Sequence, residues 1–221
     1  MIMSKNLLFD YDGTLHNNIK IFAPAFRTAY AHLVSLGHAE PREFSDYDIS
    51  HWTGYTETEM WAEFMPNLPQ ALQHEAGAMI ESEMLHLLRT GGASLYDGVL
   101  EMLGTLCDAD YRLIFLSNCM HNYMATHREQ FGLDAWFTDF FCAEDYNFSP
   151  KHEVFPIIRQ KHPGDYIVIG DRFHDMEVAR IHGLKSIGCA YGYARPEELA
   201  HATVRVTSPA DIVTAVDSLA L

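Results

Sequence analysis

The chain is poor in positive charge relative to negative charge. It contains 15 Lys and Arg residues against 30 Asp and Glu residues, which gives a formal net charge of −15 at pH 7. Nucleic-acid backbones are bound by clustered Lys and Arg, so this composition excludes DNA or RNA as an expected partner. An anionic small molecule would also be repelled, unless a metal ion or local cations reversed the field at its binding site.

Cysteine and long apolar segments are scarce as well. Cys107, Cys119, Cys142 and Cys189 are scattered and form no CxxC pair. This spacing is typical of small buried thiols in a reducing compartment and not of a disulfide framework. No apolar run reaches the roughly 20 residues of a membrane span, and the N-terminus lacks a signal-peptide pattern. The sequence therefore predicts a cytoplasmic protein that does not contact a membrane.

Short runs that are apolar on both faces recur along the chain, as expected of strands in a covered parallel sheet. They span residues 6–9, 111–116, 166–169, 185–190 and 203–206. Helical patterns separate them from about residue 92 onward. These lie at residues 97–107, 121–131, 150–161 and 173–182, with a last helix opening at Ser208-Pro209. Alternation of strand and helix predicts an α/β fold with a parallel sheet.

Residues 17–91 differ from the rest because they contain no convincing strand. Aromatic and aliphatic side chains recur at helical spacing from Phe22 to Leu36 and again from Met79 to Leu88. We therefore expect an all-helical domain over residues 17–91. It would be inserted into a core domain formed by residues 1–16 and 92–221.

Two acidic residues, Asp10 and Asp12, follow the first apolar run in the string FDYDGTL. They fall at the carboxyl end of a predicted strand, where open α/β sheets bind ligands. Gly13 allows a sharp turn, and Thr14 adds a hydroxyl at the same place. A solvated acidic turn is the alternative, whereas a calcium-binding loop is excluded because its bidentate acid would fall at Ile21.

The next candidates are a polar pair and a lysine. Ser117-Asn118 ends the second apolar run shortly before a predicted helix, and helix N-termini bind phosphate. The same pair is also common in turns and caps. Lys151 follows Ser149-Pro150 in the first turn of another helix, where its charge opposes the helix dipole. That placement calls for an anionic partner, although a surface lysine is the alternative.

A second acidic pair, Asp171 and Asp175, follows another buried run in the string IGDRFHD. A helix begins directly afterwards, which we expect to place Asp171 at its N-cap and Asp175 on the same face one turn later. Capping alone does not explain why two strands both end in paired acids. Hard oxygen ligands gathered at one edge of a sheet predict a site for Mg²⁺.

Taken together, these motifs resemble those of the haloacid dehalogenase superfamily. FDYDGTL is similar to its first motif, LSN to its second, SPK to its third and IGDRFHD to its fourth, in matching order from residue 6 to about 190. The likeness is to the phosphoglycolate phosphatase-like branch, which has a helical cap between the first and second motifs. It implies a doubly wound, Rossmann-like core with the helical domain as the cap.

The resemblance also implies an activity, that of a Mg²⁺-dependent phosphatase acting on a small phosphorylated metabolite. Asp10 would be the nucleophile that forms an aspartyl phosphate, and Asp12 would be the general acid and base. Lys151 would be the third catalytic residue and would offset negative charge. The implied Mg²⁺ ligands are Asp10, the main-chain carbonyl of Asp12, Asp171 and Asp175.

Substrate contacts are implied in both domains. In the core, Thr14, Ser117 and the amide of Asn118 would hold the phosphoryl oxygens. In the cap, the polar loop at Gly54-Tyr55 would reach the active site and help to set specificity. A plain turn that caps the following helix is an equally good interpretation of that loop.

Two other functions stay open. A phosphomutase of the β-phosphoglucomutase type shares the first motif, but that branch typically has a His where this chain has Phe22. A non-catalytic phosphate-binding module is the second alternative. Arg172 stands where a small hydroxyl residue is usual, and we expect it to pair with a neighbouring acid. Among the 13 histidines, only His152 and His174 adjoin motif residues. The sequence is compatible with a monomer or a homodimer.

Overall fold

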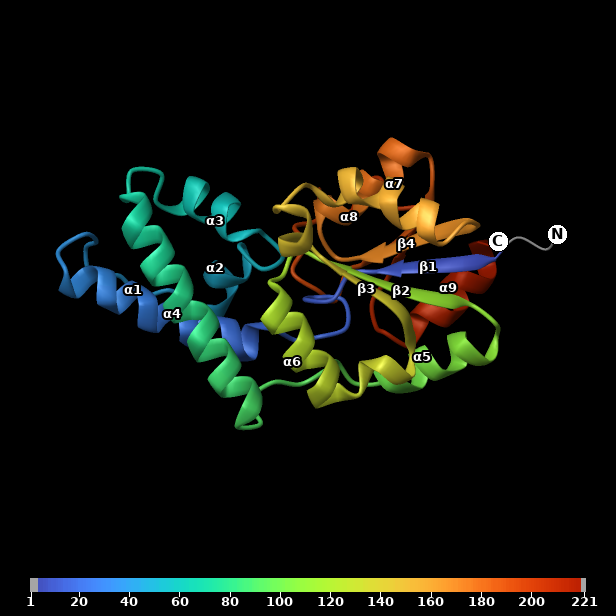
Figure 1. Cartoon of the computed structure of the whole chain (residues 1–221), viewed down its shortest axis with the longest axis horizontal. Coiled ribbons are helices and arrows are strands. Elements are labelled where there is room, and N and C mark those ends of the chain that lie inside the picture. The colour runs from blue at the N-terminus through green and yellow to red at the C-terminus, as the bar shows by residue number, and fades with distance from the viewer. Residues whose placement is uncertain (1–3, 220–221) are drawn as a thin grey trace. The chain divides into compact units, whose positions relative to one another are not determined.

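The computed structural model describes residues 4–219 of the 221-residue chain. The chain divides into two compact units, which the ribbon in Figure 1 traces. The first consists of residues 1–17 and 95–221, and the second of residues 18–94.

Within residues 4–219 of the chain, six parallel strands form one sheet in the order β3-β2-β1-β4-β5-β6. The strands are β1 (Lys5–Phe9), β2 (Arg112–Ser117), β3 (Phe137–Cys142), β4 (Asp165–Gly170), β5 (Lys185–Cys189) and β6 (Val204–Val206). Phe9 of central β1 pairs with Phe115 of β2 and with Ile169 of β4. The strand order reverses beside β1, which confirms the predicted doubly wound α/β fold. Ligands bind at the carboxyl edge of such a reversal point.

Strand β3 is absent from the sequence-based prediction. Its sequence, FTDFFC, places Thr138 and Asp139 inside the run, so it lacks the continuous apolar character of the other strands. The reason is its position, because β3 lies at the sheet edge and pairs with β2 alone. Asp139 is held by the ammonium of Lys161 and the ring of His162, both at 2.7 Å. An edge strand tolerates such polar side chains.

Helices cover both faces of the sheet. They are α5 (Val99–Asp108), α6 (His121–Phe131), α7 (Lys151–Lys161), α8 (Phe173–His182) and α9 (Asp211–Leu219), with the short 3₁₀ turns η1 (Leu133–Ala135) and η2 (Ala143–Tyr146). Figure 1 shows α7 and α8 on one side and α5 and α9 on the other. Under α7 and α8, Val154, Phe155 and Val178 pack with Leu8 and Ile114 of the central strands. This buried apolar layer fixes the strand ends that carry the acidic residues.

Glycines end α6 and α8, whereas the start of α9 differs from the sequence-based expectation. Gly132 and Gly183 end α6 and α8 with φ angles of 61° and 65°, as C-cap glycines do. The last helix begins at Asp211 and not at Pro209, so that expectation is wrong by two residues. The Asp211 carboxylate accepts hydrogen bonds from the amide and the hydroxyl of Thr207, both at 3.2 Å, and this turn precedes the helix.

The second unit is all-helical over its residues 18–94. Its helices are α1 (Ile19–Ser35), α2 (Asp46–Ser50), α3 (Glu57–Phe64) and α4 (Gln70–Arg89). The rings of Phe26, Trp52 and Phe64 pack together in this unit, with centroid distances of 5.2 Å from Phe26 to Trp52 and 4.6 Å from Trp52 to Phe64. Thr56 caps α3 in a reciprocal pair with Glu59.

In neither unit do the described residues include a helix with the length and apolar character of a membrane span.

Candidate active site

The acidic residues of the two strand-end motifs meet at one edge of the sheet. Asp10 follows β1 and Asp171 follows β4, and these strands are neighbours. The amide of Asp10 donates to the carbonyl of Ile169 at 2.9 Å, which continues the pairing past the end of β1. The parallel register therefore brings the two motifs to the same place although they are 161 residues apart in the chain numbering.

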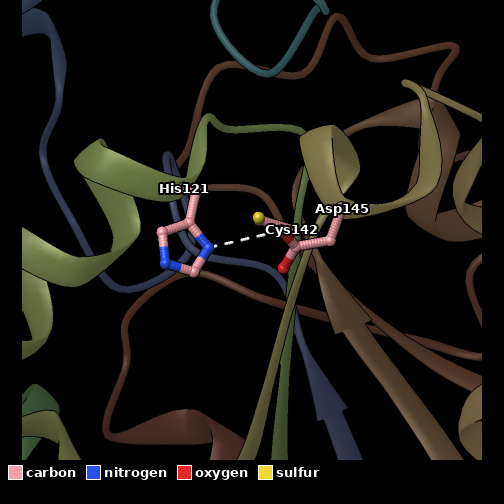
Figure 2. Close-up of side chains that lie close together, drawn as sticks. All are labelled: His121, Cys142 and Asp145. Atoms are coloured by element: carbon pink, nitrogen blue, oxygen red, sulfur yellow. Dashed lines mark hydrogen bonds and ion pairs between the residues drawn. The ribbon is translucent and has the colours of Figure 1, made fainter.

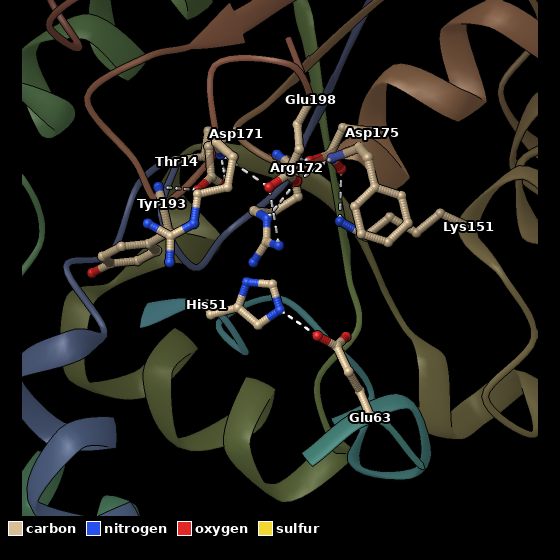
Figure 3. Close-up of polar contacts among 11 residues, drawn as sticks. Thr14, His51, Glu63, Lys151, Asp171, Arg172, Asp175, Tyr193 and Glu198 are labelled. Carbon is tan, nitrogen blue, oxygen red and sulfur yellow. Dashed lines mark hydrogen bonds and ion pairs between the residues drawn. The ribbon is translucent and has the colours of Figure 1, made fainter. Parts of the chain in front are cut away.

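Three carboxylates and one ammonium form the centre of the site. Asp10, Asp171 and Asp175 each offer an oxygen within 4.8 Å of the others, and all three residues are buried. Lys151, the first residue of α7, donates to Asp10 Oδ1 at 2.6 Å and to Asp175 Oδ1 at 2.7 Å. Figure 3 shows Lys151 pointing at Asp175. The anionic partner that the position of Lys151 requires is thus provided by two acids.

Helix α8 is capped one residue later than the sequence-based expectation. The N-cap is Arg172 and not Asp171, so Asp171 precedes the helix. The Asp175 Oδ2 atom accepts the amide of Arg172 at 3.1 Å, while its Oδ1 atom faces Lys151. Asp175 is the third residue of α8, and its carboxylate supplies the acceptor for the amide of the N-cap residue, as in a capping box. Asp171 therefore does not cap the helix, and its carboxylate lies in the cluster with Asp10 and Asp175.

Close backbone packing fixes Asp171. Its Oδ2 atom accepts the amide of Tyr193 at 2.7 Å, and its Oδ1 atom lies 3.4 Å from the Thr14 hydroxyl (Figure 3). Gly13, with a φ of +84°, and Gly192 leave room for this carboxylate. A Cβ atom on Gly13 would lie 2.1 Å from Asp171 Oδ2, and one on Gly192 would lie 2.4 Å from the Gly13 carbonyl oxygen. Only glycine fits at either position without movement of the Asp171 carboxylate or of the loop backbone.

The site holds more negative charge than its own cation neutralises. Burial and then the charge of Asp175 raise the pKa of Asp10 to about 7, against the pull of Lys151. Burial and the charge of Asp10 raise the pKa of Asp171 well above its ordinary value. Burial disfavours the charge of Lys151, but Asp10 and Asp175 outweigh it and raise the pKa of Lys151. An additional positive charge would stabilise the ionised cluster.

The donor set fits a hard divalent cation such as Mg²⁺. Three carboxylates supply oxygen ligands, which this ion prefers. Asp10 Oδ2 is buried, and no hydrogen-bond partner for it exists among the described residues. Such an orphaned acceptor is costly unless something binds it. The side chain of Asp12 lies outside this cluster, so its predicted contribution through the main-chain carbonyl stays a prediction.

Asp12 has a separate environment, although it is only two residues from Asp10. Its carboxylate is held by the ring of His16 and the hydroxyl of Tyr123, and it is 13% exposed. Neither contact was predicted, since the motifs point only to His152 and His174 among the histidines and Tyr123 is 111 residues from Asp12. His152 instead pairs with Glu177 at 3.2 Å, and His174 stacks on the neighbouring Phe173 ring. Neither arrangement is a contact with the carboxylate cluster.

The other predicted substrate contacts lie in both units, with Ser117 and Asn118 in the core unit and Gly54 and Tyr55 in the helical unit. Ser117 is the last residue of β2 and is buried, with Asn118 directly after it. Gly54 and Tyr55 lie in the helical unit between α2 and α3, where Gly54 has a φ of +83°. These positions agree with the expected elements, and the roles of all four residues stay predictions.

Arg172 pairs with an acid, as the sequence analysis expected. Its guanidinium contacts Glu198 twice, at 2.8 Å through Nε and at 3.3 Å through Nη2, and Figure 3 shows this pair. Glu198 also accepts the amides of Phe173 and Arg195. The pair therefore ties the start of α8 to the segment before β6. Its partner could not be read from the sequence because it is 26 residues away.

A second group of potential metal ligands consists of His121, Cys142 and Asp145 (Figure 2). The His121 ring and the Asp145 carboxylate are 3.3 Å apart, and both residues are exposed. Burial raises the pKa of the Cys142 thiol to about 11. The thiol is therefore protonated near neutral pH, whereas the thiolate is the form that binds soft metals. We interpret this group as a hydrogen-bonded cluster beside α6.

A doubly wound sheet with acidic pairs after β1 and β4, and a lysine from α7 between them, is the arrangement that the four sequence motifs predict. The chain belongs to the haloacid dehalogenase-like hydrolase family, whose model matches residues 7–189. The family predicted from the four motifs is thus confirmed.

Known proteins resemble this chain over nearly its whole length. Pyrophosphatase PpaX from Listeria monocytogenes serotype 4a (strain HCC23) is 27% identical over 202 residues, which cover 88% of this chain and 87% of that protein. A crystal structure of a predicted phosphatase from Clostridium acetobutylicum superposes with a TM-score of 0.83 at 20% identity, covering 98% of this chain and 99% of the other. A predicted phosphoglycolate phosphatase from Haemophilus somnus 129pt gives a TM-score of 0.79 at 19% identity, covering 97% and 99%.

The raised pKa of Asp10 predicts a pH-dependent stability. Between pH 3.8 and about 7, the native state without cation keeps a proton that the unfolded state has lost. Stability must then fall as pH rises through this window. In the presence of a chelator, we expect the unfolding temperature of wild type to fall with rising pH across this window more steeply than that of Asp10→Asn. Added Mg²⁺ should make the two slopes of unfolding temperature against pH equal. Parallel slopes for the two proteins in chelator would contradict the argument.

The packing around Asp171 predicts that Gly192→Ala weakens cation binding. The new Cβ atom would meet the Gly13 carbonyl oxygen at 2.4 Å and Asp171 Cβ at 2.5 Å, so the carboxylate must move. Displaced supporting groups typically cost about 10- to 100-fold in metal affinity. Isothermal titration with Mg²⁺ measures this. Gly104→Ala is the control, because its Cβ would meet only the Trp136 ring, at 3.4 Å. Equal affinities in the two variants would exclude the predicted effect.

Proposed function

We propose that this protein is a Mg²⁺-dependent phosphatase that hydrolyses a small phosphomonoester through an aspartyl phosphate on Asp10. The observation that supports it most is the buried group of Asp10, Asp171 and Asp175 with Lys151, in which Asp10 Oδ2 has no partner among the described residues. A nucleophilic carboxylate must be desolvated, oriented and partly neutralised. This one meets all three requirements.

In the first step, a carboxylate oxygen of Asp10 attacks phosphorus in line with the ester oxygen. The bond from phosphorus to the ester oxygen breaks, its electron pair stays on that oxygen, and Asp12 supplies the proton that makes the leaving alcohol. Two unit charges of the same sign at ~4 Å repel by about 4 kcal/mol at an effective dielectric of about 20. Lys151 offsets part of that repulsion, because it already contacts Asp10 at 2.6 Å.

In the second step, Asp12 takes a proton from water, and the water oxygen attacks phosphorus. The bond between phosphorus and Asp10 breaks, which restores the Asp10 carboxylate and releases inorganic phosphate. Asp12 ends the cycle protonated and ready for the next substrate. Thr14, Ser117 and the amide of Asn118 would hold the phosphoryl oxygens during both steps.

Mg²⁺ would be held by Asp10, Asp171, Asp175 and the main-chain carbonyl of Asp12. When bound, this ion supplies positive charge that neutralises and orients the phosphoryl oxygens. The acidic chain can then accept an anionic substrate, because the local field is reversed where the substrate binds.

We also propose that the helical unit, predicted over residues 17–91, serves as the cap that excludes water and selects the leaving group. The polar loop with Gly54 and Tyr55 would make the selection. A left-handed Gly54 and a capped following helix support a defined loop conformation there. The protein would act as a monomer or homodimer on a small phosphorylated metabolite.

The relatives suggest which substrates to test first. Several are named pyrophosphatase PpaX, so inorganic pyrophosphate belongs in the panel beside phosphoglycolate, sugar phosphates and nucleotides. A phosphomutase ranks lower, because buried Phe22 stands where that branch has a His. A non-catalytic phosphate-binding module ranks lower too, since each catalytic residue type is present.

The proposal predicts that wild type with Mg²⁺ releases phosphate from p-nitrophenyl phosphate and that Asp10→Asn does not. Loss of the nucleophile should lower kcat by at least about 10⁴-fold, since covalent catalysis at that atom is removed. Asp139→Asn is the matched control, because Asp139 is a carboxylate of edge strand β3 that contacts Lys161 and His162. It should retain wild-type turnover.

Two results would overturn the proposed function. One is no phosphate release by wild type across the whole panel, which would favour a binding module. The other is release by Asp10→Asn at the wild-type rate. Formation of an isomeric sugar phosphate without release of inorganic phosphate would instead support the mutase.

A further inference from the structure

Two side chains outside the motifs hold the carboxylate of Asp12. His16 Nδ1 lies 2.8 Å from Asp12 Oδ1, and the Tyr123 hydroxyl donates to the same oxygen at 2.9 Å. The two partners are 3.3 Å apart, and both are buried. Neither of these contacts involves Asp12 Oδ2. Both contacts therefore converge on one oxygen and leave the other available.

The backbone of the first motif fixes His16. The carbonyl of Tyr11 accepts the amides of Thr14, Leu15 and His16, at 3.2, 2.8 and 3.0 Å. The amide of Gly13 donates to the carbonyl of His16 at 2.9 Å. The loop thus folds back on itself directly after Asp12, and it presents the imidazole to the carboxylate four residues earlier. His16 is fully buried, so its ring has little freedom to move.

Helix α6 fixes Tyr123. Tyr123 and His127 are one turn apart on this helix, and their ring centroids are 4.0 Å apart. His127 in turn accepts or donates a hydrogen bond at 2.7 Å with the Tyr11 hydroxyl, and its ring lies 4.6 Å from that of His16. Burial and then His16 lower the pKa of His127 to about 2, so it packs here as a neutral ring. These four rings form one buried cluster.

The hydrogen bonds assign the tautomer of His16. Its Nε2 atom is buried, and no partner for that atom exists among the described residues. Asp12 Oδ1 already accepts the Tyr123 hydroxyl, so its 2.8 Å contact with His16 Nδ1 requires a hydrogen on that nitrogen. The hydrogen therefore belongs on Nδ1, where it donates to Asp12 Oδ1. Tyr123 donates as well, so Asp12 Oδ1 receives two hydrogen bonds.

We propose that His16 and Tyr123 are positioning residues that fix the Asp12 carboxyl with Oδ1 as the acceptor and Oδ2 as the proton-carrying oxygen. The inference rests on the proposed function, in which Asp12 protonates the leaving group. The terminal torsion of an Asp side chain is soft, so outside contacts decide which oxygen faces the reaction. If the acid already has this geometry when the substrate binds, the entropic cost of ordering it is not added to the reaction barrier.

The proposal has a kinetic consequence that depends on the leaving group. A poor leaving group, such as an alkoxide, needs its proton in the transition state, whereas p-nitrophenolate departs without help. Loss of Asp12 positioning should therefore lower kcat/KM by about tenfold for alkyl phosphates, a fraction of the usual general-acid contribution, and by less than about threefold for p-nitrophenyl phosphate. The slope of log(kcat/KM) against leaving-group pKa should become steeper.

The experiment measures that slope for wild type, His16→Leu and Tyr123→Phe with Mg²⁺ over a series of aryl and alkyl phosphates. Tyr123→Phe removes only a hydroxyl, so it keeps the test valid where His16→Leu fails to fold. His16→Asn restores an N–H donor near Nδ1 and should recover part of the wild-type slope. A residue that served the fold alone would lower the rates of all substrates by the same factor.

Two controls separate positioning from packing. Tyr11→Phe removes a hydroxyl from the same ring cluster that faces His127 and not Asp12, so it should keep the wild-type slope. In an Asp12→Asn background, Tyr123→Phe should cause no further steepening, because residues that act through Asp12 lose their effect when its acid is absent.

The outcomes distinguish this inference from the proposed function. A steeper slope in His16→Leu and Tyr123→Phe, absent in Tyr11→Phe, supports the inference. A wild-type slope in both variants overturns it and leaves the proposed function standing. Absence of turnover by wild type overturns the proposed function and this inference together.

Discussion

The burial of three carboxylates around a single ammonium is the constraint on which the rest of this structure depends. The apolar sheet and the helices that cover it hold Asp10 and its partners away from water, so their charges cannot be screened. Lys151 compensates for only part of the charge. Glycines at positions 13, 170 and 192 allow the backbone to approach this closely, since a Cβ atom on any of them would lie within 2.5 Å of the acids or their loops.

Asp10 and Asp12 have different surroundings although they are only two residues apart. Asp10 lies among charged groups beside β4, with Lys151 on one oxygen. Asp12 contacts His16 of its own loop and Tyr123 of α6, and keeps some exposure to solvent. Such a division is how one strand end can supply both a nucleophile and a proton carrier, because environment sets the role of each carboxyl group.

The parts of the fold that could be predicted are those whose signal is local. Strands that are buried on both faces read as continuous apolar runs, and the acids at their ends identify the binding edge. Edge strand β3 was missed because Asp139 interrupts its pattern. The N-cap of α8 was placed at Asp171 because aspartate is a common cap, whereas Asp175 supplies the acceptor to the amide of Arg172 instead. The contact between Asp12 and Tyr123 spans 111 residues and depends on how α6 packs, so no local pattern could indicate it.

The central claim is that Asp10 becomes covalently phosphorylated. It is tested most directly by quenching wild type in acid during turnover of a phosphomonoester with Mg²⁺ and mapping the added phosphoryl group by peptide mass spectrometry. The account predicts one phosphoryl group on the peptide that contains Asp10, lost on treatment with hydroxylamine and absent from Asp10→Asn. Steady turnover with the phosphoryl group on another residue, or retained in the Asp10→Asn protein, would contradict it.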